Sequence, residues 1–452
     1  MGQLLLSLSK HRGQTVKALA ERMIKEALWT VDPHHLILNR LYKDGDNLVI
    51  RDELTLHLSD YRHIYLIGIG KGVAPMAAAM EEILGERLYK SRIIVKYDHG
   101  QPLNKTEVYE AGHPIPDANT LKGSQKLLEL AREARADDLV FVLITGGGSA
   151  LFELLPQSMG LEDLAHINSM LIASGASIDE INTVRKHLSL VKGGRLAGHI
   201  SPARCVSLIL SDVIGDPLES IASGPTAPDP TMFADARNIL EKYNLWNKLS
   251  PQIRLIIEGK NEKVGESPGK NDPVFRKVNN IIIGNNRLAL ETLRTVAQDD
   301  GYKTLILTDR AEGEAREIGV FLAGLIRSAK KSGIPFSSPG CLIFGGEPTV
   351  TIKGKGKGGR NQELALAVLL ALRNFDEPYY FCSVGSDGTD GPTDAAGAWI
   401  DEKTWQKVMD KNMDARIYLE NNDAYHFFQA INQLIITGPT RTNVMDLIFF
   451  LV

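Results

Sequence analysis

The chain has 452 residues, of which 43% are hydrophobic and 23% charged, and its 51 basic and 55 acidic side chains give a formal net charge of −4. This length and composition predict a globular protein of two or at most three domains and exclude a collagenous, coiled-coil or disordered chain. Because the charge is nearly balanced, we expect a small-molecule partner and neither nucleic acid nor an anionic membrane surface.

Only three cysteines occur, Cys205, Cys341 and Cys382, and no two of them have CxxC spacing. This pattern is incompatible with a disulfide framework or a cysteine-rich zinc site and fits a reducing compartment. No apolar stretch reaches the ~18 residues of a membrane span, and the apolar run at residues 4–6 is too short for a signal peptide. We therefore expect a cytoplasmic protein and leave a homo-oligomer open.

The first half of the chain alternates strand and helix patterns. Apolar residues recur at helical spacing over residues 16–28, and Asp32 and Pro33 end this helix. Strands are predicted over 61–69, 92–96, 139–144 and 205–210, and helices over 76–84, 119–135, 160–174 and 178–199. The uninterrupted apolar run at 139–144 is typical of a parallel strand buried on both faces, which predicts a doubly wound sheet.

A charged segment rich in glycine and proline, residues 258–272, is the expected linker between two domains, 1–270 and 271–452. Beyond it, strands are predicted over 279–283, 304–307, 341–344, 349–352 and 379–384, and helices over 285–298, over 318–329 and after Asn361. The helix at 318–329 carries an apolar stripe that includes Phe321, which we expect to pack on a sheet.

Glycine loops follow several of the predicted strands, where ligands bind in open α/β sheets. Gly146, Gly147 and Gly148 lack a β-carbon and can bring their backbone close to an anion, while Ser149 can cap the next helix and donate its hydroxyl. The alternative is a tight strand-to-helix turn. Lys71, in the glycine loop after the first long strand, can meet a phosphate or a carboxylate, and a solvated surface lysine is the alternative.

A second loop, Lys353-Gly-Lys-Gly-Lys-Gly-Gly-Arg360, places four cations among four glycines. Such a flexible basic loop, with Lys355 and Lys357, suits polyphosphate, although a solvated hairpin tip would give the same pattern. Arg360 stands at the start of the next helix, where its planar guanidinium can hold a transferring phosphoryl group.

Acidic residues also follow apolar strands, among them Asp212, Asp387 and Asp390. Such carboxylates can hold Mg²⁺ or accept a proton from an attacking hydroxyl, and they serve equally often as helix caps and in Asx turns. His113 has no metal-ligand partner at helical spacing, so it is either a substrate hydrogen-bonder or a structural histidine.

Two nucleotide-binding signatures and one hydrolase signature are missing. The sequence has no GxxxxGK[ST] and no GxSxG, and the loop after the first long strand departs from GxGxxG because position 73 is Val73. These departures weaken a nicotinamide dehydrogenase and do not support an α/β-hydrolase.

The order of these loops resembles one family, the class II glycerate kinases with a MOFRL domain, also called glycerate 2-kinases. The resemblance covers most of the chain. It rests on motifs that include Gly112-His-Pro-Ile-Pro-Asp117, Thr145-Gly-Gly-Gly-Ser-Ala-Leu151, Ser211-Asp-Val-Ile-Gly-Asp216, Gly345-Gly-Glu347, Gly358-Gly-Arg-Asn-Gln-Glu363 and Ser386-Asp-Gly-Thr-Asp-Gly-Pro-Thr-Asp394.

The resemblance implies an α/β fold with a Rossmann-like doubly wound N-terminal domain, a mixed α/β MOFRL-type C-terminal domain and an active site in the cleft between them. It also implies phosphorylation of D-glycerate by ATP with Mg²⁺ or another divalent cation, generally to 2-phosphoglycerate. Lys71 and Arg360 match basic residues that the family is thought to use on the transferring phosphate, and Asp387 matches an acid of its C-terminal motif.

We therefore hypothesise direct in-line transfer of the γ-phosphoryl group, with Lys71, Arg360 and Asp387 as catalytic residues. Asp212 or Asp390 would hold Mg²⁺, and Arg185 or Arg195 would take the substrate carboxylate. The further nucleotide- and substrate-binding candidates are His113, Gly146, Gly147, Gly148, Ser149, Glu347, Lys355, Lys357 and Asn361.

Two other functions stay open at this point. One is an NAD(P)H-dependent hydroxypyruvate reductase, a name that relatives of this family have carried, and the missing GxGxxG counts against it. The other is a non-catalytic two-domain protein that closes on an anionic metabolite and has little use for the acidic loops. The sequence does not decide between the 2- and 3-hydroxyl as phosphate acceptor.

Overall fold

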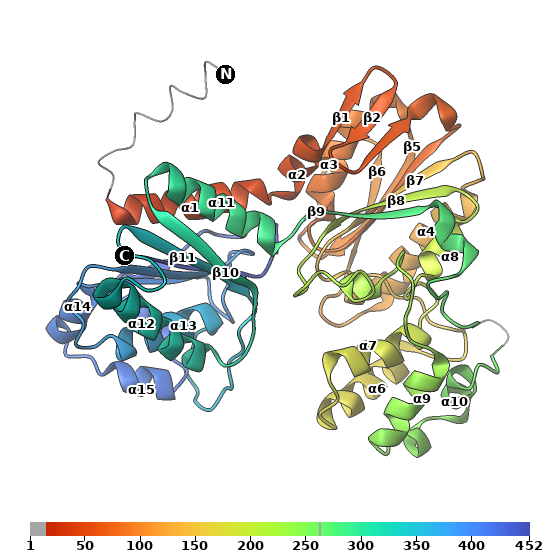
Figure 1. Ribbon diagram of the computed structural model, residues 1–452. Helices are drawn as coiled ribbons and strands as arrows, with labels where there is room; N and C mark the ends of the chain where they lie inside the picture. The colour runs from red at the N-terminus through yellow and green to blue at the C-terminus, as the bar shows by residue number, and fades with distance from the viewer. Residues whose placement is uncertain (1–14, 262–263) are drawn as a thin grey trace. The chain divides into compact units, whose positions relative to one another are not determined.

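The computed structural model describes residues 15–261 and 264–452, and it divides into two compact units (Figure 1). Within the described residues, the parallel-sheet unit is formed by the part of the chain from Pro33 to Gly284, and the mixed-sheet unit by the residues up to Asp32 together with Asn285–Val452. The prediction of an α/β fold with a Rossmann-like part and a MOFRL-type part is confirmed. The boundary predicted near residue 270 stays a prediction, and the structural division falls later, at Gly284.

The parallel-sheet unit is built on six strands, all paired in parallel, in the order β6-β5-β4-β7-β8-β9. The strands are β4 (Ile64–Ile69), β5 (Leu88–Lys96), β6 (Thr106–Ala111), β7 (Leu139–Ile144), β8 (Arg204–Leu210) and β9 (Val278–Gly284). In order along the chain they form the 3-2-1-4-5-6 arrangement of a doubly wound fold, which places its topological switch point between β4 and β7. Every residue of β4 and β7 is buried, as expected for central parallel strands.

Nine helices and a small antiparallel sheet complete the described part of this unit. The helices are α2 (Pro33–Arg40), α3 (Val73–Leu84), α4 (Ala118–Glu133), α5 (Gly148–Leu151), α6 (Leu161–Ala173), α7 (Ile178–His187), α8 (Arg195–Ile200), α9 (Phe233–Lys242) and α10 (Pro251–Ile257). The small sheet consists of β1 (Leu41–Asp44), β2 (Asn47–Ile50) and β3 (Leu54–His57). Helices α6, α7, α9 and α10 lie together away from the sheet and share an apolar core of their own (Figure 1).

The mixed-sheet unit has six strands in the order β10-β11-β15-β12-β13-β14, of which only β10 and β11 are parallel. The strands are β10 (Lys303–Ala311), β11 (Gly340–Gly346), β12 (Tyr380–Gly385), β13 (Gly397–Asp401), β14 (Leu434–Ile435) and β15 (Asp446–Leu451). The helices are α1 (Val16–Thr30), α11 (Asn286–Asp299), α12 (Ala315–Ser332), α13 (Arg360–Ala371), α14 (Thr404–Asp410), α15 (Ala415–Glu420) and α16 (Ala424–Ala430).

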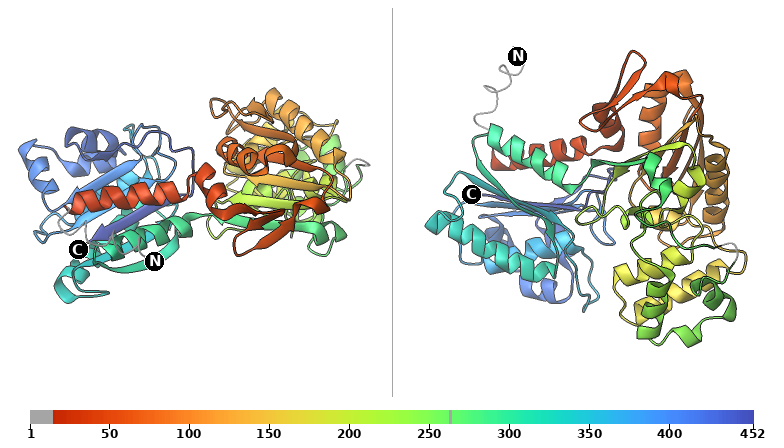
Figure 2. Two further views of the ribbon diagram at one scale, coloured as in Figure 1. Left: turned by 90° about the horizontal axis from the view of Figure 1, so that it is seen from above. Right: turned by 45° about the vertical axis from the view of Figure 1, so that its right-hand side comes forward.

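Helices cover both faces of the mixed sheet. Helices α1 and α11 pack against each other on one face, and α12 and α13 pack together on the other (Figures 1 and 2). The core on the second face contains alternate residues of the central strands, such as Leu342, Phe344, Ile448 and Phe450. Packing of α1 against α11 explains why the first helix belongs to the unit formed by the last third of the chain.

The structure departs from the sequence-based predictions at four places. The helix predicted over 178–199 is two helices: the first ends at His187, and the second begins at Arg195, directly after Gly193 and Gly194, whose φ are +55° and +77°. Residues 349–352 form no strand, only an isolated bridge at Thr349. Phe321 is 59% exposed instead of packed on the sheet. Residues 258–261 and 264–272 of the expected linker lie inside the parallel-sheet unit, because β9 pairs with β8 beyond them.

The described helices include none with the length and apolar character needed to cross a membrane.

Candidate active site

The loops after β4 and β7 meet at the switch point of the parallel sheet. The backbone N–H of Lys71 donates to the carbonyl oxygen of Gly146 over 2.9 Å, and the N–H of Gly72 donates to Oγ1 of Thr145 over 2.9 Å. Ligands of doubly wound folds bind at this position, outside the carboxyl ends of the strands. The predicted Lys71 and glycine loop are therefore neighbours in the structure.

Gly147 brings Lys71 and His113 together. A β-carbon at Gly147 would lie 2.9 Å from Cγ of Lys71 and 3.0 Å from Nε2 of His113, and Gly147 has a left-handed φ of +82°. Both the close approach and the conformation require glycine here. Among residues 15–261 and 264–452, no hydrogen bond or ion pair engages the Lys71 ammonium group, so it can meet an anion at this loop.

Asp212 lies over the same loop, because a β-carbon at Gly146 would overlap its Oδ2. The group therefore contains an ammonium group, an imidazole and a carboxylate within reach of a glycine-rich backbone. Burial, with a smaller effect of Lys71, lowers the pKa of His113 from 6.5 to about 4. His113 is therefore neutral near pH 7 and can both donate and accept a hydrogen bond.

Ser149 lies inside α5 and does not cap it, since the N-cap residue is Gly147. Its Oγ lies 2.7 Å from Oγ of Ser223, and its carbonyl oxygen accepts from Nη2 of Arg185 over 3.1 Å. Ala222 and Ser223 have left-handed φ of +51° and +61°, a costly conformation that tends to persist at functional sites. Arg185 therefore lies at the glycine loop, as do Lys71, His113 and Asp212.

The structure does not bring Arg195 to this loop. Its Nη1 donates to Oγ of Ser267 over 2.6 Å and its Nη2 donates to the carbonyl oxygen of Gly265 over 2.8 Å. These contacts give Arg195 a structural task, whereas its predicted contact with a substrate carboxylate has no support in this geometry.

A buried ion pair, absent from the sequence analysis, lies behind the loop. Nζ of Lys192 is 3.1 Å from Oε2 of Glu153, and both side chains are 0% exposed. Burial lowers the pKa of Lys192 to about 8, although the negative charge of Glu153 opposes this shift. An isolated lysine and glutamate 39 residues apart in the sequence carry no signal of such a pair.

In the mixed-sheet unit, Arg360 is fixed by a buried carboxylate that the sequence analysis did not select. Nε and Nη2 of Arg360 donate to the two carboxylate oxygens of Asp446 over 2.5 and 3.1 Å, a bidentate pair. Asp446 is 0% exposed, and burial raises its pKa while the pair with Arg360 opposes that rise. Nη1 of Arg360 lies 2.9 Å from Oε1 of the exposed Glu347. Nη1 is therefore the guanidinium nitrogen that is not bonded to Asp446, and it contacts Glu347.

Asn361 and Asp390 are both buried below the start of α13. Asn361 donates from Nδ2 to Asp446 over 2.9 Å and accepts from Ser383 Oγ over 2.6 Å. Oδ1 of Asp390 accepts from the backbone N–H of Asn361, and Oδ2 accepts from the N–H and Nε2 of Gln362. Asp390 therefore caps α13, the alternative that the sequence had left open, and both of its oxygens are engaged.

The basic loop is held in place and is not a flexible tip. The N–H groups of Lys353, Lys355 and Lys357 donate to side-chain oxygens of Asn422, Asn421 and Asp423 over 2.8, 3.0 and 2.8 Å. All three lysine side chains are exposed. The backbone of this loop is therefore fixed, and it carries three exposed lysine side chains, which we call the lysine row.

Asp387 follows β12 and is half-buried. Its Oδ1 accepts from the N–H and Oγ1 of Thr389 over 3.0 and 3.1 Å. This is an Asx-type turn, in which one of the two carboxylate oxygens accepts both hydrogen bonds.

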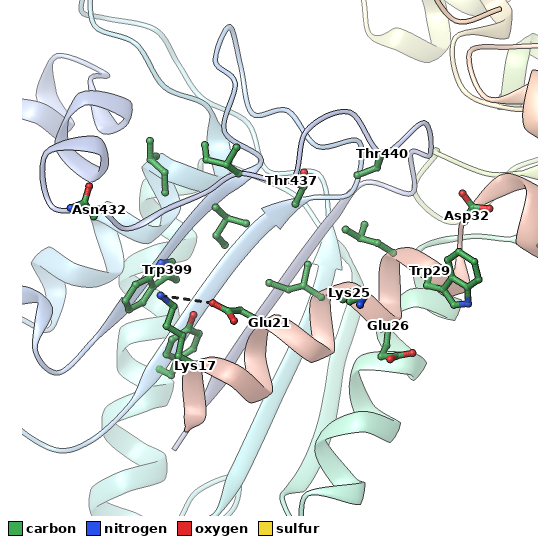
Figure 3. Close-up of a pocket in the computed structure, with 16 residues that line it drawn as sticks. Lys17, Glu21, Lys25, Glu26, Trp29, Asp32, Trp399, Asn432, Thr437 and Thr440 are labelled. Atoms are coloured by element: carbon green, nitrogen blue, oxygen red, sulfur yellow. Dashed lines mark ion pairs between the residues drawn. The ribbon is translucent and has the colours of Figure 1, made fainter. Parts of the chain in front are cut away.

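A cavity of about 1040 Å³ lies elsewhere in the mixed-sheet unit, between α1 and the strands β12 to β14 (Figure 3). Lys17, Glu21 and Trp29 of α1 and Trp399 of β13 contribute to its walls. None of the site residues predicted from the sequence lines this cavity. It is therefore separate from the groups around Gly147 and Arg360.

Comparison with protein families gives two matches. Residues 19–258 match a domain of unknown function, DUF4147, and residues 340–446 match the MOFRL family.

Three similar proteins illustrate the relationship. The chain is 40% identical to a glycerate 2-kinase of Pyrococcus horikoshii over 97% of each chain, and 41% identical to a D-glycerate 2-kinase of Thermotoga maritima over 97% of this chain and 99% of the relative. A putative hydroxypyruvate reductase of Agrobacterium vitis is 39% identical over 84% of this chain and 85% of the relative. A crystal structure of Thermotoga maritima glycerate kinase matches with a TM-score of 0.87 at 40% identity, over 97% of this chain and 99% of that one.

The chain therefore belongs to the MOFRL-type glycerate 2-kinase family, as its motifs had indicated.

The neutral state of His113 gives a pH-dependent contribution to stability. Because its pKa is lowered from 6.5 to about 4, the folded state binds fewer protons than the unfolded state between these values. This contribution is present above about pH 6.5 and is lost as the pH falls toward 4. We expect the free energy of unfolding of His113→Gln to fall less than that of wild type between pH 7 and 4.5, measured by urea denaturation. Exposed His166→Gln is the matched control, and coincident profiles for wild type and His113→Gln would contradict the assignment.

If Asp390 caps α13, its removal should lower the free energy of unfolding and leave Mg²⁺ binding unchanged. Asp390→Ala leaves two backbone N–H groups of α13 without an acceptor, so we expect its free energy of unfolding to fall by about 1–2 kcal/mol. Mg²⁺ should change the stability of wild type and variant by equal amounts, because a ligand that binds elsewhere stabilises both alike. Exposed Asp376→Ala is the control. A Mg²⁺-dependent stabilisation that disappears in Asp390→Ala would instead make Asp390 a metal ligand.

Proposed function

We propose that the chain is an ATP-dependent glycerate kinase that transfers the γ-phosphoryl group of ATP to the 2-hydroxyl of D-glycerate, giving 2-phosphoglycerate and ADP. The observation that carries this proposal is about 40% identity to two curated glycerate 2-kinases along nearly the whole chain. Direct in-line transfer fits, because phosphoryl transfer needs positioned charges more than a nucleophile of the enzyme's own.

Lys71 and Arg185 are proposed to receive the anionic groups at the glycine loop. Lys71 would neutralise charge on the transferring phosphoryl group, and Arg185 would hold the glycerate carboxylate. Both side chains contact the loop at residues 146–149, which supports these two roles. Neutral His113 would bond a glycerate hydroxyl.

Arg360 is proposed to act through its Nη1. Asp446 fixes the orientation of the guanidinium, and Glu347 is the exposed group that a phosphoryl oxygen would replace at Nη1. The Arg360–Asp446 pair stays intact in this exchange, so a buried charge is never left without a partner. Asn361 then serves to hold Asp446 instead of contacting the nucleotide.

Asp387 is proposed to accept the proton of the attacking hydroxyl, since its second oxygen is available for that contact. Mg²⁺ usually takes one or two protein carboxylates together with phosphate oxygens, and when bound it would neutralise charge on the nucleotide. Asp212 fits this requirement by its position over the glycine loop. Asp390 does not fit, because backbone and amide donors engage both of its oxygens. Within the described residues no cluster of three or more metal-binding side chains occurs.

One observation supports a hydroxypyruvate reductase: the two Agrobacterium vitis relatives carry the name putative hydroxypyruvate reductase. Against it stands the loop after β4, which lacks the third glycine of the dinucleotide fingerprint because position 73 is Val73. Cytoplasmic location, a homo-oligomer and a cleft between the two domains stay predictions.

A coupled assay tests the proposal. Purified full-length protein is given D-glycerate, ATP and Mg²⁺, and ADP release is followed together with enolase-dependent detection of 2-phosphoglycerate. ADP with immediate enolase-competent product supports the proposal, whereas a product that needs a mutase first would move the acceptor to the 3-hydroxyl. NAD(P)H oxidation on hydroxypyruvate without ADP release would establish the reductase instead.

In this assay, Lys71→Ala and Arg360→Lys should each lower kcat by about 10²–10³-fold, the usual cost of one charge-stabilising contact. Arg360→Lys keeps a cation beside Asp446 but loses the bidentate geometry, which limits the loss of stability. Exposed Lys122→Ala is the control, and the melting temperature of each variant shows that it is folded. Near wild-type turnover in both variants would remove Lys71 and Arg360 from catalysis.

A further inference from the structure

We infer that the α- and β-phosphates of ATP bind to the lysine row of the mixed-sheet unit and that glycerate binds to the glycine loop of the parallel-sheet unit. This inference rests on the proposed function and adds to it a separate site for each substrate. The observations that carry it are how the lysine row is built and how the charges differ between the two sites.

The lysine row has the construction of a preorganised anion site. Gly354 and Gly356 alternate with the lysines, and a β-carbon at either position would overlap the backbone around Asn421 or Asp423. Glycine at every second position therefore lets the loop lie directly on residues 421–423, while the lysines between them stay exposed. The glycines thus allow the loop to pack against residues 421–423, and the lysines between them present a row of cations to solvent.

A buried network ties this row to the helix that carries Arg360. Oδ1 of Asn422 accepts from the N–H groups of Lys353 and Gly354, and its Nδ2 donates to Oε2 of Glu363 over 2.9 Å. Glu363 is 2% exposed, lies in the first turn of α13 and pairs with Arg316 over 2.8 Å. A merely solvated basic tip would have no need of such support, and the fixed backbone lowers the entropy cost of binding.

The charge of the row suits a polyanion. Three ammonium groups, each with three N–H donors, stand near two carboxylates: that of Asp423, which fixes the row, and that of Glu314, which interacts with the charge of Lys353. In the described part of the chain, no hydrogen bond or ion pair is formed by the ammonium groups of Lys353, Lys355 and Lys357. Lysine contacts phosphate as a point charge and tolerates several geometries, as a flexible triphosphate requires.

The glycine loop suits a small monoanion instead. Its two cations that contact the loop are Lys71 and Arg185, and the carboxylate of Asp212 lies over the same loop, whereas the lysine row presents three ammonium groups. A 2-hydroxy acid brings one carboxylate and hydroxyl groups that can bond an imidazole and the Ser149–Ser223 pair.

Helix dipoles do not favour the opposite arrangement. Helix α3 begins at Val73, just after Lys71, and its dipole attracts a carboxylate as well as a phosphate, while α5 has only four residues and adds little. The N-terminus of α13 is closed by the Asp390 carboxylate. The choice between the two sites therefore depends on the side-chain cations.

Binding and kinetics of the full-length protein test the inference. The triple variant Lys353→Ala/Lys355→Ala/Lys357→Ala should bind ATP about 10–100-fold more weakly than wild type in calorimetry without glycerate, since each contact to a charged group contributes substantially. Its KM for D-glycerate should be unchanged. The reciprocal variant Arg185→Lys should raise the KM for D-glycerate and leave ATP affinity unchanged.

Two further variants separate the row from general charge and folding effects. Lys303→Ala/Lys403→Ala/Lys411→Ala removes three exposed cations of the same unit and should leave ATP affinity unchanged. Asn422→Ala keeps the lysines but loosens the loop, and it should raise the KM for ATP without changing the KM for D-glycerate. Unchanged ATP affinity in the lysine-row variant, or an effect on D-glycerate instead, would overturn the inference. ATP binding by wild type without ADP formation would refute the proposed function alone.

Discussion

Close backbone contact at glycine positions is the constraint on which both candidate sites depend. Lys71, His113 and Asp212 converge because Gly146 and Gly147 have no β-carbon at the points of contact. The lysine row lies on residues 421–423 for the same reason, with Gly354 and Gly356 at the points of contact. In each case the glycines leave room for neighbouring side chains and backbone, and the cations beside them supply the charge. The glycines therefore affect ligand binding indirectly, because they allow the close contacts that position the charged side chains.

A second constraint is the cost of buried charge. Asp446 is fully buried at the start of β15, and the bidentate pair with Arg360 is what makes its burial tolerable. Asn361 satisfies the same carboxylate, so the beginning of α13 is fixed to β15 at two neighbouring residues. This arrangement defines which guanidinium nitrogen remains for another anion. The orientation of the Arg360 guanidinium group is therefore determined by Asp446, a residue remote in sequence.

The sequence predicted the parts of this architecture that local patterns determine. The apolar run at 139–144 indicated a central parallel strand, and the glycines after it indicated the loop at the switch point. Contacts between distant residues could not be predicted this way: Arg360 and Asp446 are 86 residues apart, and Lys186 and Asp229 form another buried pair, with 2.6 Å between Nζ and Oδ1. One signal was available, since Asp446 directly precedes six apolar residues, Leu447 to Val452, a pattern that places an acid at the end of a buried strand. The sequence allowed Asp390 to be either a metal ligand or a helix cap, and only the fold shows that it caps α13.

The contacts of Arg360 also bear on whether the protein transfers a group or only binds an anion. A simple anion receptor gains most from cations whose donors are free, yet Arg360 gives two of its donors to Asp446 and a third to Glu347. This lowers its net attraction for an anion and fixes the plane of its guanidinium. Transition-state stabilisation rewards such fixed orientation, because only contacts that strengthen as charge develops accelerate the chemical step. The arrangement therefore fits phosphoryl transfer, with the roles proposed here: affinity for the lysine row and orientation of the phosphoryl group for Arg360.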